Sequence, residues 1–437
     1  MIAIIGAGPA GLAAATTAAT GGERVILIDS AAQLGGQYWR HLPSNWKDER
    51  SLHYNFDKAQ KLFDLVLSNP LITRYSSAHV WQAEKIDGKF HLYLIKDGIE
   101  EKIVAEKVIL ATGAYDRSLP FPGWTYPGVM TPGAAQGMLK SHGVLVGKKI
   151  VIAGTGPFLL PVAAGLAESG AEIVGLFEAN SPLRWVLNLH GLILNPGKIL
   201  EAIYYFKKLR KFRVRIQYKK TVEQATRTSA IVGGKEVSCD VLAVGWGFVP
   251  DLSLAGILGA KLRVDADGTV LVKVDSNQET SVPGLFAAGE STGIGGSTLA
   301  LIEGEIAGGG RSTKVKFARL RAQIFARGLQ KVYPVPTDWQ KNLQPQTIIC
   351  RCEEVSQEDI CTSIDELGAE NGRTAKLFTR AGMGLCQGRV CSRNVSEIVA
   401  HHTHQKVLDS ELIAGAQRPM AGPISLGELG DGLGKKF

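Results

Sequence analysis

Short apolar runs and glycine-rich turns follow one another in a repeated order near the N-terminus. Residues 2–5 are apolar, a glycine-rich turn and an Ala-rich stretch follow, and a second apolar run, residues 25–28, ends at Asp29. Apolar runs of this length predict buried strands, and the Ala-rich stretch between them predicts a helix. This order of strand, turn, helix and strand predicts a parallel α/β unit.

The first turn, residues 6–11 (GAGPAG), has the spacing of a dinucleotide-binding loop. In such a loop Gly6 permits the tight turn, Gly8 lets the backbone approach a pyrophosphate, and Gly11 lets the helix pack closely on the sheet. The helix N-terminus then faces the phosphates, and the acidic residue after the second strand accepts hydrogen bonds from the ribose. The alternative is a strand-to-helix turn that is merely close-packed. The residues assigned to this site are Gly6, Gly8, Pro9, Ala10, Gly11 and Asp29.

A second copy of this pattern begins at Lys149 and ends at Glu178. Its third glycine is replaced by Leu159, so the helix cannot approach the sheet as closely. NAD(P), another nucleotide such as ATP, or an empty structural relic are the alternatives here, and Glu178 would repel a 2'-phosphate and favour NAD. The residues assigned to this second site are Gly154, Gly156, Pro157 and Glu178.

Four further segments resemble the flavoprotein disulfide reductase superfamily: residues 35–37 (GGQ), the strand 108–113 ending in ATG, residues 244–250 (VGWGFVP) and residues 284–290 (GLFAAGE). The resemblance implies FAD in the first half. The last segment usually ends in Asp, so Glu290 departs from the family by one methylene. The resemblance adds these FAD-binding residues: Gly36, Gln37, Ala111, Thr112, Gly113, Gly289 and Glu290.

Composition restricts the function further. The chain is 45% hydrophobic with 51 glycines, which is typical of a globular α/β enzyme. The net charge of +8 is spread along the chain, with denser stretches at 198–220 and 314–331, which favours solvated helices or an acidic protein partner over nucleic acid. We find no export signal or transmembrane segment and therefore expect a cytoplasmic protein. Peripheral membrane association through an electron acceptor is the alternative location. Neither nucleotide-binding half contains C-x-x-C, so dithiol-based disulfide reduction is not expected.

Four of the six cysteines gather after the Pro-containing stretch 333–336, as C-x-C and then C-x-x-x-x-C. If the first pair lies on an extended segment, both thiols point to the same side and can bind one metal together. The second pair lies in a glycine-rich loop, residues 382–391, where backbone amides can turn toward sulfur. Structural zinc normally uses longer spacers than C-x-C, and unliganded thiols are the remaining alternative. We interpret Cys239 and Cys361 as ordinary buried thiols.

Residues 346–400 resemble the 2Fe-2S domain of bacterioferritin-associated ferredoxin, through C-x-C and G-x-G-x-C-x-G-R-x-C. The resemblance implies that the cluster ligands are Cys350, Cys352, Cys386 and Cys391. The expected fold is therefore α/β, with two Rossmann-like dinucleotide-binding domains and a small C-terminal iron-sulfur domain. The expected domains are FAD-binding (1–117 and 262–312), second nucleotide-binding (118–261), a linker (313–345), and 2Fe-2S domain with tail (346–437).

In this order the parts resemble the FAD and iron-sulfur α subunits of heteromeric amino-acid and opine dehydrogenases. The resemblance implies a β subunit of D-amino-acid-oxidase type that oxidises the C–N bond of an amine, sometimes a small third subunit, and FMN at the subunit junction. This chain would relay electrons. We can name no catalytic acid or base, and the histidines at 401, 402 and 404 are expected to be solvated rather than metal-bound. Two rivals stay open: a self-sufficient NADH-dependent ferredoxin-type reductase, and a scaffold subunit with structural nucleotides.

Overall fold

The computed structural model describes residues 1–42 and 52–433, with side chains to residue 430. The first half is built on a five-stranded parallel sheet in the order β20-β7-β1-β2-β3. The apolar runs seen in the sequence form its central strands. The strands are β1 (Ile2–Ile5), β2 (Val25–Ile28), β3 (Ile72–Tyr75), β7 (Lys107–Leu110) and β20 (Leu285–Ala287).

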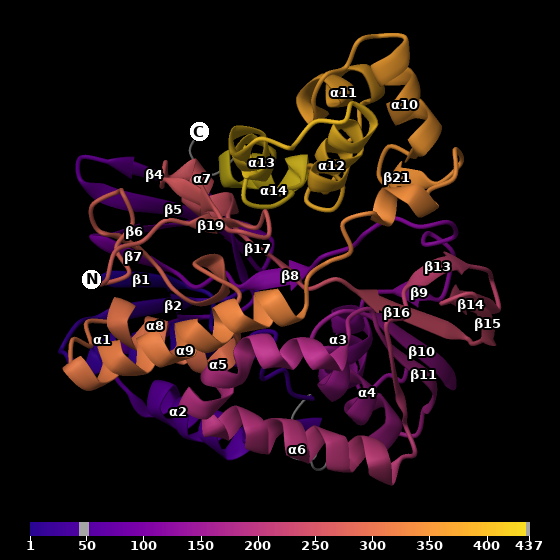
Figure 1. Cartoon of the computed structure of the whole chain (residues 1–437). Helices are drawn as coiled ribbons and strands as arrows, with labels where there is room; N and C mark the ends of the chain where they lie inside the picture. Colours follow the sequence, from indigo (N-terminus) through magenta and orange to yellow (C-terminus); the bar gives the residue numbers. More distant parts are fainter. Residues whose placement is uncertain (43–51, 434–437) are drawn as a thin grey trace.

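Helix α1 (Pro9–Thr20) crosses from β1 to β2, and α8 (Gly296–Ala307) packs beside it although the two are far apart in sequence. Two glycines of α8 permit this approach: a Cβ on Gly304 would lie 2.0 Å from the Ala10 carbonyl oxygen, and one on Gly308 would lie 2.5 Å from that of Ala14. Next in this layer come α2 (Phe56–Ser68) and α9 (Thr313–Val332). Residues 313–345 are therefore mostly helical, and α9 packs on α8 (Figure 1).

The opposite face of this sheet packs against a three-stranded antiparallel sheet, β4 (Ala78–Ile86), β5 (Lys89–Lys96) and β6 (Ile99–Ala105). Phe90, Leu92 and Leu94 of β5 are fully buried in the core that these layers share with Ile5. Helix α7 (Ser253–Ile257) and the hairpin of β18 (Leu262–Val264) and β19 (Val270–Val272) complete this lobe.

The second half repeats the arrangement with the parallel order β12-β11-β10-β16-β9. Its strands are β9 (Val129–Met130), β10 (Lys149–Gly154), β11 (Glu172–Glu178), β12 (Ile216–Tyr218) and β16 (Val241–Gly245). Its helices are α3 (Pro132–His142), α4 (Leu159–Glu168), η2 (Pro182–Asn188), α5 (Leu189–Leu194) and α6 (Pro196–Lys211). A small antiparallel sheet contains β13 (Val222–Ala225), β14 (Ser229–Val232) and β15 (Lys235–Ser238).

The two halves are joined by an antiparallel pair, β8 (Ala114–Asp116) with β17 (Phe248–Pro250). After the short helix η4 (Trp339–Asn342), the chain forms the C-terminal domain, which lies next to this pair (Figure 1). It consists of β21 (Ile348–Cys350), β22 (Val355–Ser356), α10 (Gln357–Asp365), α11 (Gly372–Thr379), α12 (Ser392–His402), α13 (Asp409–Ala416) and α14 (Leu426–Leu433).

The C-terminal domain packs against the second half and shares a hydrophobic core with it. Trp124 and Trp246 belong to the same buried cluster as Ile349, Ile360 and Val395. Within the described residues, we find no helix with the length and apolar character needed to span a membrane.

Candidate functional site

The first glycine loop has the geometry that its sequence predicts. Gly6 adopts φ +104°, and a Cβ there would lie 2.2 Å from the Ala111 carbonyl oxygen. A Cβ on Gly11 would lie 1.7 Å from the Gly6 carbonyl oxygen, so this glycine does bring the helix close to the turn. Gly8 precedes Pro9 at the start of α1, and a Cβ there would have no neighbour closer than 3.9 Å. The loop is thus close-packed on its protein side and open where a pyrophosphate would approach.

Asp29 follows β2 and lies beside this loop. Its carboxylate accepts hydrogen bonds from the backbone amides of Ala7 and Ala31, the latter at 2.7 Å. Burial raises the pKa of Asp29 above its ordinary value, although these two amides oppose the shift. The acidic group therefore fixes the loop and lies at the edge where a ribose would bind.

The segments that resemble a flavoprotein meet the first loop. Gly36 has φ +58°, and a Cβ on it would lie 2.8 Å from the Cα of Gly8, while the next residue, Gln37, accepts a 2.9 Å hydrogen bond from Arg40. On the other side, the Thr112 hydroxyl donates to the Asp251 carbonyl oxygen at 2.8 Å. Gly113 adopts φ +71° and faces open space.

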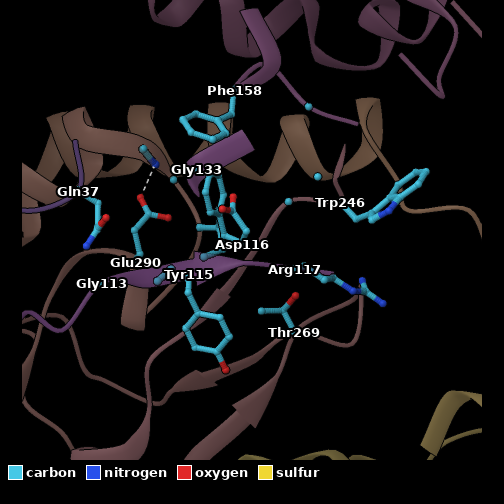
Figure 2. A pocket seen from close by; sticks show the side chains of 18 of the residues that line it. Gln37, Gly113, Tyr115, Asp116, Arg117, Gly133, Phe158, Trp246, Thr269 and Glu290 are labelled. Carbon is cyan, nitrogen blue, oxygen red and sulfur yellow. Dashed lines mark hydrogen bonds between the residues drawn. The ribbon is translucent and has the colours of Figure 1, made fainter. Parts of the chain in front are cut away.

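Gly289 and Glu290 form a 3-10 turn, η3 (Gly289–Ser291), after β20. Glu290 accepts a 2.8 Å hydrogen bond from the Gly296 amide at the start of α8 (Figure 2). Burial is the main reason that the pKa of Glu290 rises to about 7, and the neighbouring Glu303 carboxylate adds to it. Glu303, which no motif in the sequence indicated, is 2% exposed and accepts from the Gly289 amide and the Thr292 hydroxyl.

These segments line one connected cavity of about 2540 Å³ that also reaches the second glycine loop. A pocket for one ligand normally measures about 300–1,000 Å³. The space therefore exceeds the need of one cofactor. Figure 2 shows part of it, with Phe158 on one side and Tyr115 on the other.

The second loop differs from the first at its helix. Gly154 adopts φ +131°, and a Cβ there would meet the Gly245 carbonyl oxygen at 1.8 Å, whereas Gly156 faces open space. Helix α4 begins only at Leu159, so Pro157 precedes the helix instead of opening it as Pro9 does. In the second loop, which lacks the third glycine, the helix therefore begins later than it does in the first loop.

Glu178 is committed to hydrogen bonds within the protein. Its carboxylate accepts from the Thr155 hydroxyl at 2.9 Å, the Gly156 amide at 3.0 Å and the Asn180 amide at 2.9 Å. The Asn180 side chain also donates to the carbonyl oxygen of Pro334, in the stretch leading to the C-terminal domain. A ribose at this site would compete with these contacts, and the C-terminal connection forms part of the site's wall.

The four predicted cluster ligands come together as two pairs. Cys350 contacts Cys391, and Cys352 contacts Cys386. The first pair is buried, each residue 1% exposed, whereas Cys352 is exposed and Cys386 partly so. One expectation is wrong in detail: Cys350 ends β21, and residues 351–354 form a turn, so Cys352 is not on an extended segment.

The surroundings of these thiols suit a 2Fe-2S cluster. The contact with Cys391 is the largest cause that lowers the pKa of Cys350 to about 5, and the Gly382 amide, which donates to its sulfur at 3.5 Å, adds to it. A Cβ on Gly384 would lie 2.3 Å from the Cβ of Cys352, so only glycine fits beside this thiol. The described residues contain no group of three or more His, Cys, Asp or Glu side chains arranged around a single metal ion. Two pairs of thiols match two irons, each with two protein ligands.

Two family models match the chain in the same two regions. The pyridine nucleotide-disulphide oxidoreductase model covers residues 1–304, and the BFD-like [2Fe-2S] binding domain model covers residues 348–401. The chain also aligns over 98% of its length, at 32% identity, with 90% of the opine oxidase A-subunit of Agrobacterium tumefaciens. The chain belongs to the opine oxidase A-subunit family. It is a flavin-dependent oxidoreductase with a 2Fe-2S domain.

Other relatives of this opine oxidase family member carry related names. The HcnB subunit of hydrogen cyanide synthase from Pseudomonas protegens is 29% identical over 92% of this chain and 92% of its own length. The alpha subunit of sarcosine oxidase from Rhizobium meliloti is 26% identical over 98% of this chain, which spans 42% of that longer protein. The crystal structure of L-proline dehydrogenase from P. horikoshii has the same fold, with a TM-score of 0.71 and 20% identity over 98% of this chain and 78% of that one.

In this family member, the loop that carries Cys386 and Cys391 touches the first half of the chain directly. Tyr115 on β8 lines the cavity, and its hydroxyl donates to the carbonyl oxygen of Arg389, between Cys386 and Cys391, at 3.3 Å. The Arg389 guanidinium donates to the Ser253 hydroxyl at 2.9 Å. Burial raises the pKa of Tyr115 to about 12, so this phenol stays protonated at neutral pH.

A buried ion pair also holds the two parts together. Arg117, just after β8, donates to Glu397 of α12 at 2.9 Å, and Glu397 also accepts from Arg393 at 2.7 Å and from the Trp339 indole at 3.0 Å. Burial lowers the pKa of Arg117 to about 10. Burial alone would raise the pKa of Glu397, but the two guanidinium groups hold it below its usual value.

The two remaining cysteines lie apart from the four ligand candidates. Cys239 is buried, as expected. Cys361 is only partly buried, and its sulfur lies 3.8 Å from Nδ1 of His402, whose Nε2 lies 2.8 Å from Asp365. His402 is therefore engaged with α10 rather than simply solvated.

Proposed function

We propose that this chain is the FAD- and 2Fe-2S-containing electron-transfer subunit of a heteromeric dehydrogenase that oxidises the C–N bond of an amino acid or opine. A separate subunit of D-amino-acid-oxidase type performs that oxidation, sometimes with a small third subunit. The observation that carries the proposal is the contact of Tyr115, in the wall of the cofactor cavity, with the loop between Cys386 and Cys391.

Oxidation of an amine to an imine releases two electrons and two protons. A bound flavin accepts electrons in pairs and releases them singly, and a 2Fe-2S cluster accepts one at a time. The residues of this chain would hold the two groups, and the contact between Tyr115 and Arg389 would join the elements that carry them. In the proposal the first glycine loop, Asp29 and the Gly289–Glu290 turn bind FAD, and the two cysteine pairs bind the cluster.

The substrate class comes from the relatives, which are named for opine, sarcosine and hydrogen cyanide chemistry. Together with the amines that the sequence resemblance implies, the candidates are proline, hydroxyproline, sarcosine, glycine and opines. The cavity exceeds the volume of one ligand, which supports a second nucleotide, NAD or ATP, at the Gly154–Gly156 loop. FMN at the subunit junction and a cytoplasmic location complete the proposal.

The test is to purify the chain alone and with the amine-oxidising subunit encoded beside it, and to assay dye reduction with each candidate amine. We expect activity only with both subunits. Amine-dependent reduction by the lone chain at the rate of the complex would refute the relay role. Bleaching of the flavin of the lone chain by NADH would instead support the NADH-dependent reductase. A flavin that neither donor reduces in the assembled complex would support the scaffold.

A further inference from the structure

Exposed apolar side chains gather on four helices that contact one another, η2, α5, α6 and α9. Leu183 and Ile193 are 78% and 76% exposed, values far from those of core residues. We call this surface the docking face. Its members are Leu183, Val186, Leu187, Leu189, Ile193, Leu200, Ile203, Phe317 and Leu320. Exposed apolar side chains gathered on neighbouring elements mark binding sites for other molecules.

The docking face rests on a rigid base. Asn188, fully buried between η2 and α9, donates to the Phe325 carbonyl oxygen at 3.2 Å, and only glycine fits opposite it at position 328. The Arg321 side chain donates to the Leu194 carbonyl oxygen at 2.8 Å. Figure 1 shows α5, α6 and α9 together on one side of the molecule. The apolar side chains are therefore presented by a preformed surface.

Basic residues predominate on the helices of the docking face. Helix α9 contains six basic residues and no acidic one, and α6 contains five basic residues and a single acid, Glu201. Glu201 is paired with Lys198 at 2.8 Å. Lys207, Lys211 and Lys314 form no ion pair within the part of the chain that the structure describes. A complementary surface has an apolar centre and an acidic rim.

The docking face is continuous with the cofactor cavity. Trp185 of η2, Leu192 of α5, and Ile199 and Phe206 of α6 all line that cavity. A molecule seated on these helices would cover this side of the cavity and exclude water from it. An anionic membrane would satisfy the charges, but it would bring no electron donor to the cavity.

We propose that the docking face binds the amine-oxidising subunit, through an apolar surface with an acidic rim on that subunit. The inference rests on the proposed function and assigns its partner to this side of the molecule. Electrons then enter the chain beside α5 and α6 and leave through the cluster on the opposite side of β8.

The test combines Leu183→Asp and Ile193→Asp in the full chain. The matched control is Leu377→Asp with Leu408→Asp, two residues that are 63% and 65% exposed in the C-terminal domain. Both double variants should keep wild-type flavin and iron, which shows that they fold. The affinity for the purified amine-oxidising subunit, measured by calorimetry, should fall at least tenfold in the docking-face variant and less than twofold in the control.

Unchanged affinity in the docking-face variant would overturn this inference and leave the proposed function standing. If the wild-type chain binds no such subunit, both proposals fall. Sedimentation of the lone chain and flotation with phosphatidylglycerol vesicles test the other occupants. Self-association or vesicle binding that the docking-face variant loses, while it still binds the amine-oxidising subunit, would reassign the surface to a second copy or to a membrane.

Discussion

Replacing Glu397 with Gln isolates the charge that ties the cluster domain to the rest of the chain. Gln has nearly the same shape and keeps an oxygen that can accept from the Trp339 indole. The substitution leaves Arg117, which is 7% exposed, opposite a neutral group, while its Nε already has no hydrogen-bond partner among the described residues. The substitution destabilises the charge of Arg393 less, because that side chain is 22% exposed and water can solvate it.

Removing one partner of a buried ion pair costs about 3–5 kcal/mol, since the remaining charge stays desolvated. Because Gln keeps some of these hydrogen bonds, we expect Glu397→Gln to cost about 3 kcal/mol, near the lower end of that range. At about 1.4 kcal/mol per factor of ten, the form in which the C-terminal domain has separated from the rest of the chain should become roughly 100-fold more populated. Asp338→Asn is the matched control: its pair with Lys341 is 63% exposed on both sides and should contribute less than about 1 kcal/mol.

Urea unfolding measures the effect, with visible circular dichroism reporting the cluster and flavin fluorescence reporting the first half. We expect Glu397→Gln to shift the cluster transition to lower urea and to speed amide exchange in α12, with a smaller change in the flavin transition. Because the pKa of Glu397 is held below its usual value, the wild-type contribution is present at neutral pH and is lost in acid. A Glu397→Gln variant as stable as Asp338→Asn would refute the reasoning.

The remaining predictions concern the cofactors and pH. Gly8→Val should fold, since its Cβ has space, yet lose FAD. Gly156→Val strains the second loop, because Gly156 has φ +110°, but it should keep FAD, and the reverse result would mean that the two halves are exchanged. Cys386→Ser should lose iron and its visible bands while keeping flavin, whereas Cys361→Ser should keep both; unchanged iron in Cys386→Ser would contradict the ligand assignment. The raised pKa of Glu290, near Glu303 and Lys198, predicts that flavin-free protein loses unfolding free energy as pH rises from about 5 to 8. Glu290→Gln should remove that loss, and an unchanged pH profile in chemical denaturation would count against it.

Much of the site was predictable because its signals are local. Glycine loops, the acid after β2 and the paired cysteines each lie within a few residues whose spacing follows from backbone geometry. The family assignment followed from those same motifs. The turn at residues 351–354 was not predictable, because C-x-C fits both a strand and a turn.

Contacts between distant segments could not be predicted. Arg117 and Glu397 are 280 residues apart, and Tyr115 and Arg389 are 274 apart, and neither pair belongs to a periodic pattern. Glu303 appears in the sequence as an ordinary helix residue, and only its burial against the Gly289 turn reveals its role. The docking face was expected only as two basic stretches, since exposure of apolar residues depends on how η2, α5 and α9 pack.

The position of Arg389 links the proposed cluster ligands to the contact between the C-terminal domain and the rest of the chain. This residue lies between Cys386 and Cys391, so the loop that supplies two thiols also donates to Ser253 and to the Ala421 carbonyl oxygen. If Cys386 and Cys391 bind irons as proposed, this loop has few backbone conformations left, which lowers the entropy cost of its contact with Ser253. On that proposal, cluster occupancy and the contact of this loop with the rest of the chain are not independent. A chain without its cluster is then expected to hold the contact with Ser253 less firmly.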